Sequence, residues 1–184
     1  MKSIFDKVNI ILVGTTHPGN IGAAARAMKT MNVHNLRLVN PLNFPSAEAS
    51  ARAAGADDVL AECQQFSSLE DAVKDCDLVI GTSARVRGIP WPMILPRECA
   101  KKISEGTYSS VSIVFGKESS GLSNEELQLC NMVLKIPTNS EYNSLNLAAA
   151  VQIICYEIYL LITDLDSIEY KQNEVAFIDQ DKME

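Results

Sequence analysis

Short apolar runs alternate along this chain with helix-forming segments, and this alternation is the feature that most limits the possible folds. The runs are rich in Val, Ile and Leu and end at Gly, Asn or Pro, which is typical of buried strands. The repeat of strand and helix predicts an α/β fold, with a parallel sheet that helices cover on both faces. We expect five or six strands, among them 8–13, 36–39, 78–81, 111–115 and 132–136, and helices at 20–31, 47–54, 68–75, 96–104, 123–130 and 144–162. Asn20 is the expected N-cap of the first helix.

The composition is that of an ordinary globular protein. With 184 residues, of which 47% are apolar, the chain can bury one sizeable core and is not predominantly disordered. The most apolar segment, Leu147–Ile162, is interrupted by Gln152 and Glu157 and is too polar to cross a membrane. The N-terminal residues contain no apolar signal segment, and the five cysteines are scattered. We therefore expect reduced thiols, a cytoplasmic location, and no metal site.

The net charge of −7 is distributed unevenly. Residues 164–184 contain seven acidic and two basic residues, so most of the acidity belongs to this tail. Residues 78–117 contain six basic and two acidic residues, and this is where we expect a phosphate group to bind. The expected organisation is one domain over residues 1–163, followed by an acidic tail at 164–184 that is either a tether or the start of a truncated C-terminal extension.

Four loops that follow predicted strands carry most of the chemically useful side chains: 14–22, 81–87, 116–122 and 137–146. Because the carboxyl ends of parallel strands lie at one edge of a sheet, we expect these loops to meet around a ligand. They contain no GxxxxGK[ST] motif of nucleotide triphosphatases, no GxGxxG motif of dinucleotide sites and no GxSxG motif of hydrolases.

Three motifs occur in order along these loops: Asn20-x-Gly22-x-x-x-Arg26, Phe115-Gly116-x-Glu118-x-x-Gly121-Leu122, and Ile136-Pro137 with Ser144-Leu145-Asn146. Together they resemble the motifs of the SpoU (TrmH-like) RNA 2′-O-ribose methyltransferases. Residues 81–93 and 141–148 are similar, more particularly, to members that methylate the ribose of a pyrimidine at position 32 of the tRNA anticodon loop. The resemblance implies a SPOUT α/β domain with a C-terminal trefoil knot, S-adenosylmethionine (S-adenosyl-L-methionine) bound in the knot, tRNA as substrate, and a homodimer.

The resemblance also implies a role for each matching residue. The positions that correspond to catalytic ones are Arg26, Glu118, Tyr142, Ser144 and Asn146. The methyl-donor pocket would be lined by Thr82, Ser83, Ala84, Gly116, Ile136, Asn143, Ser144 and Leu145. RNA would be bound by Asn20, Arg26, Arg85 and Arg87.

Two roles are open for the motif arginine, Arg26. The sulfonium of the donor already activates the methyl carbon, so the protein has chiefly to align the 2′-hydroxyl and help it lose its proton. Accounts of the family make the arginine that base. A guanidinium resists deprotonation, however, so the other role is to bind the phosphate beside the target ribose and to stabilise the developing alkoxide.

Other functions also remain open from the sequence. Within the same enzyme class, the chain could be a 2′-O-methyltransferase that acts on another tRNA nucleotide or on an rRNA nucleotide. Outside that class, the same fold could serve as a catalytically silent RNA-binding module or as a flavodoxin-like nucleotide binder. Apolar residues of Leu147–Ile162 occupy more than one helix face, so one side is expected to pack on the sheet and another on a second subunit. Trp91 is either a base-stacking platform or a packing residue of its loop.

Overall fold

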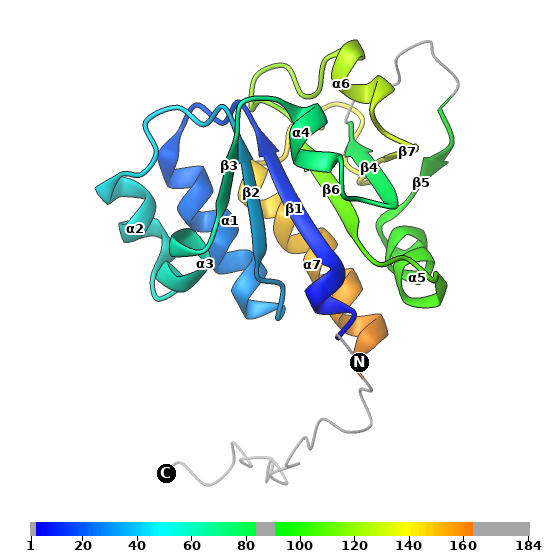
Figure 1. Ribbon diagram of the computed structural model, residues 1–184. Coiled ribbons are helices and arrows are strands. Elements are labelled where there is room, and N and C mark those ends of the chain that lie inside the picture. Colours follow the sequence, from blue (N-terminus) through cyan, green and yellow to red (C-terminus); the bar gives the residue numbers. More distant parts are fainter. Residues whose placement is uncertain (1–2, 84–90, 164–184) are drawn as a thin grey trace, which may run out of the picture.

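The computed structural model describes residues 3–83 and 91–163 (Figure 1). Its centre is a seven-stranded sheet in the order β3-β2-β1-β6-β4-β7-β5, and all neighbouring strands are parallel. Ile10 of β1 lies between Leu36 of β2 and Ile113 of β6 in the register of the sheet. The strands are β1 (Val8–Val13), β2 (Asn35–Val39), β3 (Gln64–Phe66), β4 (Leu78–Thr82), β5 (Met93–Ile94), β6 (Val111–Phe115) and β7 (Met132–Leu134).

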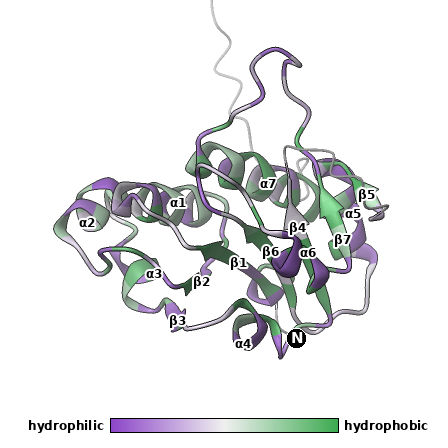
Figure 2. Cartoon of the chain, turned by 90° about the horizontal axis from the view of Figure 1, so that it is seen from above, coloured by the Kyte–Doolittle hydropathy of each residue, from purple (hydrophilic) through white to green (hydrophobic). Residues whose placement is uncertain are grey.

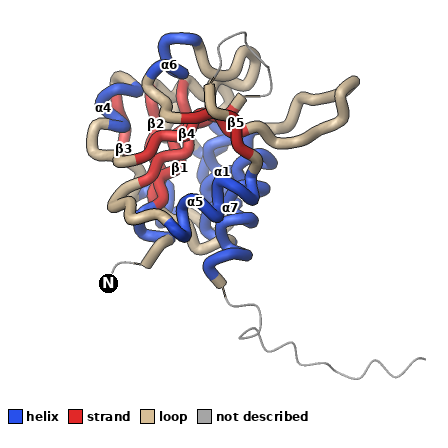
Figure 3. The backbone as a smooth tube through the Cα atoms, turned by 90° about the vertical axis from the view of Figure 1, so that its right-hand side faces the viewer, coloured by secondary structure: helices blue, strands red, loops and turns tan. Residues whose placement is uncertain are grey.

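Helices cover the two faces of the sheet unequally (Figures 2 and 3). Five helices lie over one face, where α7 packs between α1 and α5, and α2 and α3 pack against α1. Over the other face, the described part of the chain places two short helices, α4 and α6. The helices are α1 (Pro18–Thr30), α2 (Ala47–Ala53), α3 (Asp57–Ala61), α4 (Leu69–Val73), α5 (Pro96–Glu105), α6 (Asn124–Gln128) and α7 (Leu147–Ile162), and a 3-10 turn, η1 (Phe5–Lys7), precedes β1.

Because both faces of the sheet are covered, the central strands β1 and β6 are mostly apolar, with one buried polar residue each, Asn9 and Ser112. In β1, Ile10 and Leu12 point into the core beneath α1 and α7, whereas Ile11 and Val13 point into the smaller core beneath α4 and α6. All six residues of β1 are buried, so the strand needs apolar side chains on both sides. Each fully buried aliphatic side chain contributes about 1.5–3 kcal/mol of transfer free energy, which makes this strand the centre of the fold.

The predicted α/β architecture with a parallel sheet covered on both faces is confirmed, with differences in detail. The sheet has seven strands rather than five or six, because β3 and β5 are too short to show a periodic pattern. The prediction of Asn20 as a helix N-cap is wrong. Helix α1 begins at Pro18, with His17 as N-cap, since proline is favoured in the first helical turn. Asn20 therefore lies inside that turn, where its side chain is available for other contacts.

Candidate active site

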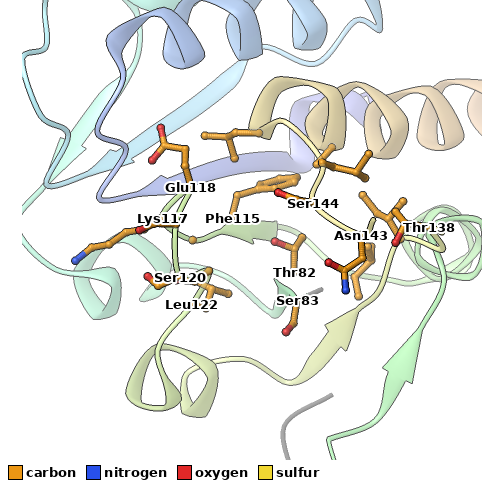
Figure 4. A pocket seen from close by; sticks show the side chains of 18 residues that line it. Thr82, Ser83, Phe115, Lys117, Glu118, Ser120, Leu122, Thr138, Asn143 and Ser144 are labelled. Carbon is orange, nitrogen blue, oxygen red and sulfur yellow. Dashed lines mark hydrogen bonds between the residues drawn. The ribbon is translucent and has the colours of Figure 1, made fainter. Parts of the chain in front are cut away.

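A hollow of about 220 Å³ lies at the carboxyl ends of β4, β6 and β7 (Figure 4). Figure 4 shows Thr82, Ser83, Asn143 and Ser144 around the same space, although Thr82 ends β4, Ser83 directly follows it, and the other two come from the loop before α7. In open parallel sheets, ligands bind outside the carboxyl ends of the strands, which is where this hollow lies. The lining residues are Thr82, Ser83, Phe115, Gly116, Lys117, Glu118, Ser119, Ser120, Gly121, Leu122, Leu134, Ile136, Thr138, Asn143, Ser144, Leu145, Leu147 and Ala150.

Seven of the eight residues predicted to line a methyl-donor pocket lie in this hollow; the eighth, Ala84, is outside the described residues. Their contact with a donor stays a prediction. The sequence motifs did not single out Lys117, Ser119 or Ser120, although these lie in the same loop as Glu118. They also missed Leu134 and Ala150, which come from β7 and α7 and which only the tertiary structure brings to the hollow.

One wall of the hollow is a tight loop that requires glycine. A Cβ atom on Gly116 would lie 2.1 Å from the carbonyl carbon of Gly121 and 2.2 Å from the amide nitrogen of Leu122. The loop is closed by the Gly121 amide, which donates to the Lys117 carbonyl at 2.8 Å, and Gly121 has a φ of +68°. Any side chain at Gly116 would therefore push the loop open, since the atoms in contact belong to the backbone.

Glu118 joins this loop to the first loop of the chain. Its Oε2 accepts hydrogen bonds from the Thr16 amide and the Thr16 hydroxyl, both at 3.1 Å. Its Oε1 accepts from Asn20 Nδ2 at 3.0 Å and from the His17 amide at 3.4 Å. Burial raises the pKa of the Glu118 carboxyl, but the hydrogen bonds from Asn20 and from backbone amides outweigh it and hold the pKa below its usual value. The Glu118 carboxyl is therefore stabilised in its ionised form. Both of its oxygens already accept hydrogen bonds, so neither is placed to act as a general base.

Asn146 connects the third motif to the same group. Its Oδ1 accepts from the amides of Ala148 and Ala149, at 2.9 and 3.3 Å, and so caps the N-terminus of α7. Its Nδ2 donates to Oδ1 of Asn20 at 3.1 Å. The three motifs predicted from the sequence thus meet at Asn20, whose amide lies between Asn146 and Glu118.

Arg26 and Tyr142 lie outside the lining of the hollow. Arg26 is exposed on α1, two turns beyond Asn20, and forms no hydrogen bond or ion pair with the residues that the structure describes. Tyr142 is 78% exposed, in the loop before α7. Ser144 is exposed and does line the hollow. The structure therefore brings Glu118, Ser144 and Asn146 close to the hollow, while Arg26 and Tyr142 are exposed and lie outside its lining.

Two basic residues of the segment 78–117, where we expected a phosphate to bind, lie next to acidic side chains instead. Arg97 is paired with Glu157 at 2.5 Å, and Lys101 lies 3.9 Å from Glu105. The predicted RNA-binding residues Arg85 and Arg87 lie outside the described residues, as does the predicted tail at 164–184. Trp91 is half-buried against the smaller core and donates its Nε1 hydrogen to the Cys130 carbonyl at 3.4 Å, which agrees with a packing role.

Comparison with known proteins decides the family. The sequence profile described as the SpoU rRNA Methylase family matches residues 7–156, which include all three motifs. The chain belongs to this family. One SpoU relative, the tRNA (cytidine/uridine-2′-O-)-methyltransferase TrmJ of Photorhabdus laumondii subsp. laumondii, is 50% identical over 183 residues, which are 98% of this chain and 76% of that protein.

Solved structures agree with the SpoU assignment. TrmJ from Z. mobilis ZM4 superposes with a TM-score of 0.79 and 39% identity, over 83% of this chain and 68% of that one. The SpoU methyltransferase AviRb from Streptomyces viridochromogenes, in complex with the cofactor AdoMet, has a TM-score of 0.69 over 88% of this chain and 62% of that one. At 20% identity, AviRb supports the fold alone. The C-terminal knot is implied by this SpoU fold rather than by any one contact.

Other kinds of site find no support in the described part of this SpoU domain. Within residues 3–83 and 91–163, no group of three or more His, Cys, Asp or Glu side chains could hold a metal ion. In the same ranges, no helix is long and apolar enough to cross a membrane. All five cysteines are free thiols, and burial raises the pKa of Cys99, Cys130 and Cys155 to about 12. These three are therefore protonated packing residues rather than nucleophiles.

Proposed function

We propose that this protein transfers a methyl group from S-adenosylmethionine to a ribose 2′-hydroxyl of tRNA, and that the target is a pyrimidine at position 32 of the anticodon loop. The observation that carries the proposal is that all three SpoU motifs meet at Asn20, which bonds to Glu118 of the hollow and to Asn146, in a chain 50% identical to a TrmJ that is named as a tRNA (cytidine/uridine-2′-O-)-methyltransferase. The proposed tRNA substrate also supports a cytoplasmic location for this protein.

The hollow has the chemistry that S-adenosylmethionine requires. Leu122, Leu134 and Ile136 offer an apolar surface for the adenine ring, and Thr82 and Ser83 lie beside it with hydroxyl groups. The close backbone of Gly116 and Gly121 leaves amide and carbonyl groups near the ligand, which suits recognition of a nucleoside by main-chain contacts. When bound, the donor supplies a methyl group on a positively charged sulfur, so no metal ion is needed to activate it.

Arg26 is suited to bind RNA and not the donor. It is exposed, lies outside the hollow, and has no partner among the described residues, so its planar guanidinium is available to a phosphate oxygen. In that position it holds the target ribose and stabilises negative charge as the 2′-hydroxyl loses its proton. We assign Tyr142, with its 78% exposure, and Ser144 to the RNA side of the same site.

We propose a homodimer that uses the outer face of α7. The inner face, with Val151, Ile154 and Ile158, is fully buried in the core of the subunit. The outer face leaves Tyr156 at 46% exposure and Leu160 partly exposed, and a second subunit would cover these apolar side chains.

The test is mapping of ribose methylation in tRNA after incubation with the purified protein and S-adenosylmethionine. We expect methylation of a single pyrimidine at position 32, and calorimetry should show S-adenosylhomocysteine binding that a chelator does not change. Arg26→Ala should lower methyl transfer at least 100-fold, on the order of a lost transition-state contact, with donor affinity unchanged. Arg26→Lys should fail as well, since a point charge does not replace a planar fork. Arg52→Ala, at an exposed arginine of the neighbouring helix α2, is the matched control and should retain activity.

Each alternative predicts another result. Methylation elsewhere would keep the chemistry but refute the position. Donor binding without methylation of any RNA would indicate a silent RNA-binding module. A protein that binds a flavin or nucleotide, and neither S-adenosylmethionine nor S-adenosylhomocysteine, would refute the proposal as a whole.

A further inference from the structure

Asn20 was predicted to contact RNA, but its side-chain amide is bonded within the protein. It is partly buried in the first turn of α1, and both ends of its amide are bonded within the protein. Nδ2 donates to Glu118 at 3.0 Å, and Oδ1 accepts from Asn146 at 3.1 Å. The orientation of the amide is determined by its partners, because the Glu118 carboxylate can only accept and Asn146 Oδ1 is already occupied by the cap of α7.

These bonds join the two parts of the proposed reaction site. Glu118 lines the hollow directly, and Asn146 caps α7, of which Leu147 and Ala150 line the hollow. Asn20 belongs to α1, the helix that carries Arg26. The first turn of α1 is therefore tied to the donor side of the site by two side-chain bonds that span 98 and 126 residues of sequence.

We propose that Asn20 is a positioning residue, and that the chain Glu118–Asn20–Asn146 holds α1, and with it Arg26, in place relative to the methyl-donor hollow. This rests on the function proposed above. The hollow does not depend on Asn20 for its shape, because Glu118 keeps its bonds to Thr16 and His17, and Asn146 keeps its cap on α7. Loss of Asn20 therefore displaces the RNA-binding side of the site while the donor side persists.

This arrangement predicts a separation between turnover and donor affinity. A displacement on the order of 1 Å between reacting groups can lower a rate about 100-fold. Asn20→Ala should therefore lower kcat by about 10- to 100-fold. The dissociation constant of S-adenosylhomocysteine should change by less than about threefold, because the bonds that shape the hollow remain.

A charge substitution tests the contact itself. Asn20→Asp keeps the acceptor for Asn146 but places a second carboxylate against Glu118, in the position of a 3.0 Å hydrogen bond. At high pH both carboxylates are ionised and repel each other, whereas at lower pH they share one proton and restore the bond. The kcat of Asn20→Asp, relative to wild type, should therefore rise as the pH is lowered. The adjoining elements carry further titratable or charged side chains, and these are unchanged in the Asn20 and Glu118 variants: His17, Arg26, Glu48, Arg52, Lys117, Glu141 and Tyr142.

The double variant Asn20→Asp with Glu118→Gln reverses the donor and the acceptor. The introduced glutamine can donate to the introduced aspartate with one end of its amide and still accept from Thr16 with the other, at the cost of the long bond from the His17 amide. The kcat of the double variant should be at least tenfold higher than that of either single variant. Its kcat relative to wild type should not rise further as the pH is lowered. Asn32→Asp, at an exposed residue just beyond the opposite end of α1, is the matched control and should behave as wild type.

The measurements are steady-state methylation of tRNA at saturating substrate across a pH series, which gives kcat, and calorimetry with S-adenosylhomocysteine for each variant. Wild-type kcat for Asn20→Asp at all pH values, or a double variant no better than the single ones, would overturn the positioning role. An equal loss of donor affinity and kcat would also overturn it. Failure of the wild-type protein to methylate tRNA would instead refute the proposed function. The coupling of Asn20 to Glu118 is then still measurable, as non-additive changes in the unfolding equilibrium constant across the same four proteins.

Discussion

Replacing Gly22 with alanine is expected to force α1 and α2 apart. A Cβ atom at Gly22 would lie 1.9 Å from the carbonyl oxygen of Ala49, 2.8 Å from its carbonyl carbon and 2.9 Å from the amide nitrogen of Ala53. All three atoms belong to the backbone of α2, so no rotation of a side chain can relieve the contact. Ordinary contact begins at about 3.4 Å, and the helices must therefore separate by about 1.5 Å at this point.

Two opposing effects determine how much Gly22→Ala lowers the free energy of unfolding. Overpacking of this kind costs about 1–3 kcal/mol, and rigid backbone partners favour the upper part of the range. Alanine in place of glycine inside a helix contributes about 1 kcal/mol in the stabilising direction. We therefore expect a net loss of about 1–2 kcal/mol in the free energy of unfolding. For a domain of this size, each kcal/mol lowers Tm by about 2–4 °C.

Urea unfolding followed by circular dichroism measures this loss, and Gly19→Ala is the matched control. Gly19 lies in the same helix, but its Cβ would meet Oε1 of Glu48 at 2.7 Å, the end of a flexible and exposed side chain. We expect Gly19→Ala to change the free energy of unfolding by less than about 0.5 kcal/mol. Because Gly22 lies between Asn20 and Arg26, Gly22→Ala should also slow methyl transfer. A Gly22→Ala protein as stable as wild type would refute the close approach of the two helices.

Three further predictions concern stability, the donor pocket and assembly. Hydrogen bonding to Arg37 lowers the pKa of Asp75 to about 2, so its contribution to stability is present above about pH 4 and lost as the pH falls toward 2. The Asp75 side chain is 58% exposed, so we expect this contribution to be about 1 kcal/mol, and urea unfolding of Asp75→Asn should lose that part of the pH dependence. Gly116→Ala should weaken S-adenosylhomocysteine binding at least tenfold in calorimetry while the protein stays folded, because the loop it opens is a wall of the hollow; unchanged affinity would place the donor elsewhere. Tyr156→Glu should yield monomers in sedimentation at micromolar concentration where the wild-type protein sediments as a dimer, since it places a charge on the exposed face of α7; a wild-type monomer would count against the dimer.

Much of the fold follows from short-range patterns that the sequence shows. The apolar run of β1 predicts a strand buried on both faces, and the helix expected at 123–130 is present as α6, with Ser123 and Glu126 forming a capping box at its start. The start of α1 was also readable, because Pro18 is a stronger signal for a first turn than Asn20 is for a cap. By contrast, β5 has two residues, which is too few for any periodicity to appear.

The residues of the site were recognisable from the sequence, but their physical roles were not. Motif spacing identified Asn20, Glu118 and Asn146 without showing that they bond to one another, because their contacts join residues 98 and 126 positions apart. The order of the strands decides which loops meet, and this order depends on packing of whole elements rather than on local preference. The sequence by itself therefore determined the alternation of strand and helix and the set of chemically useful loops. Only the tertiary structure decided that hydrogen bonds lower the pKa of Glu118, that α1 and α2 approach closely at Gly22, and that Arg26 is exposed.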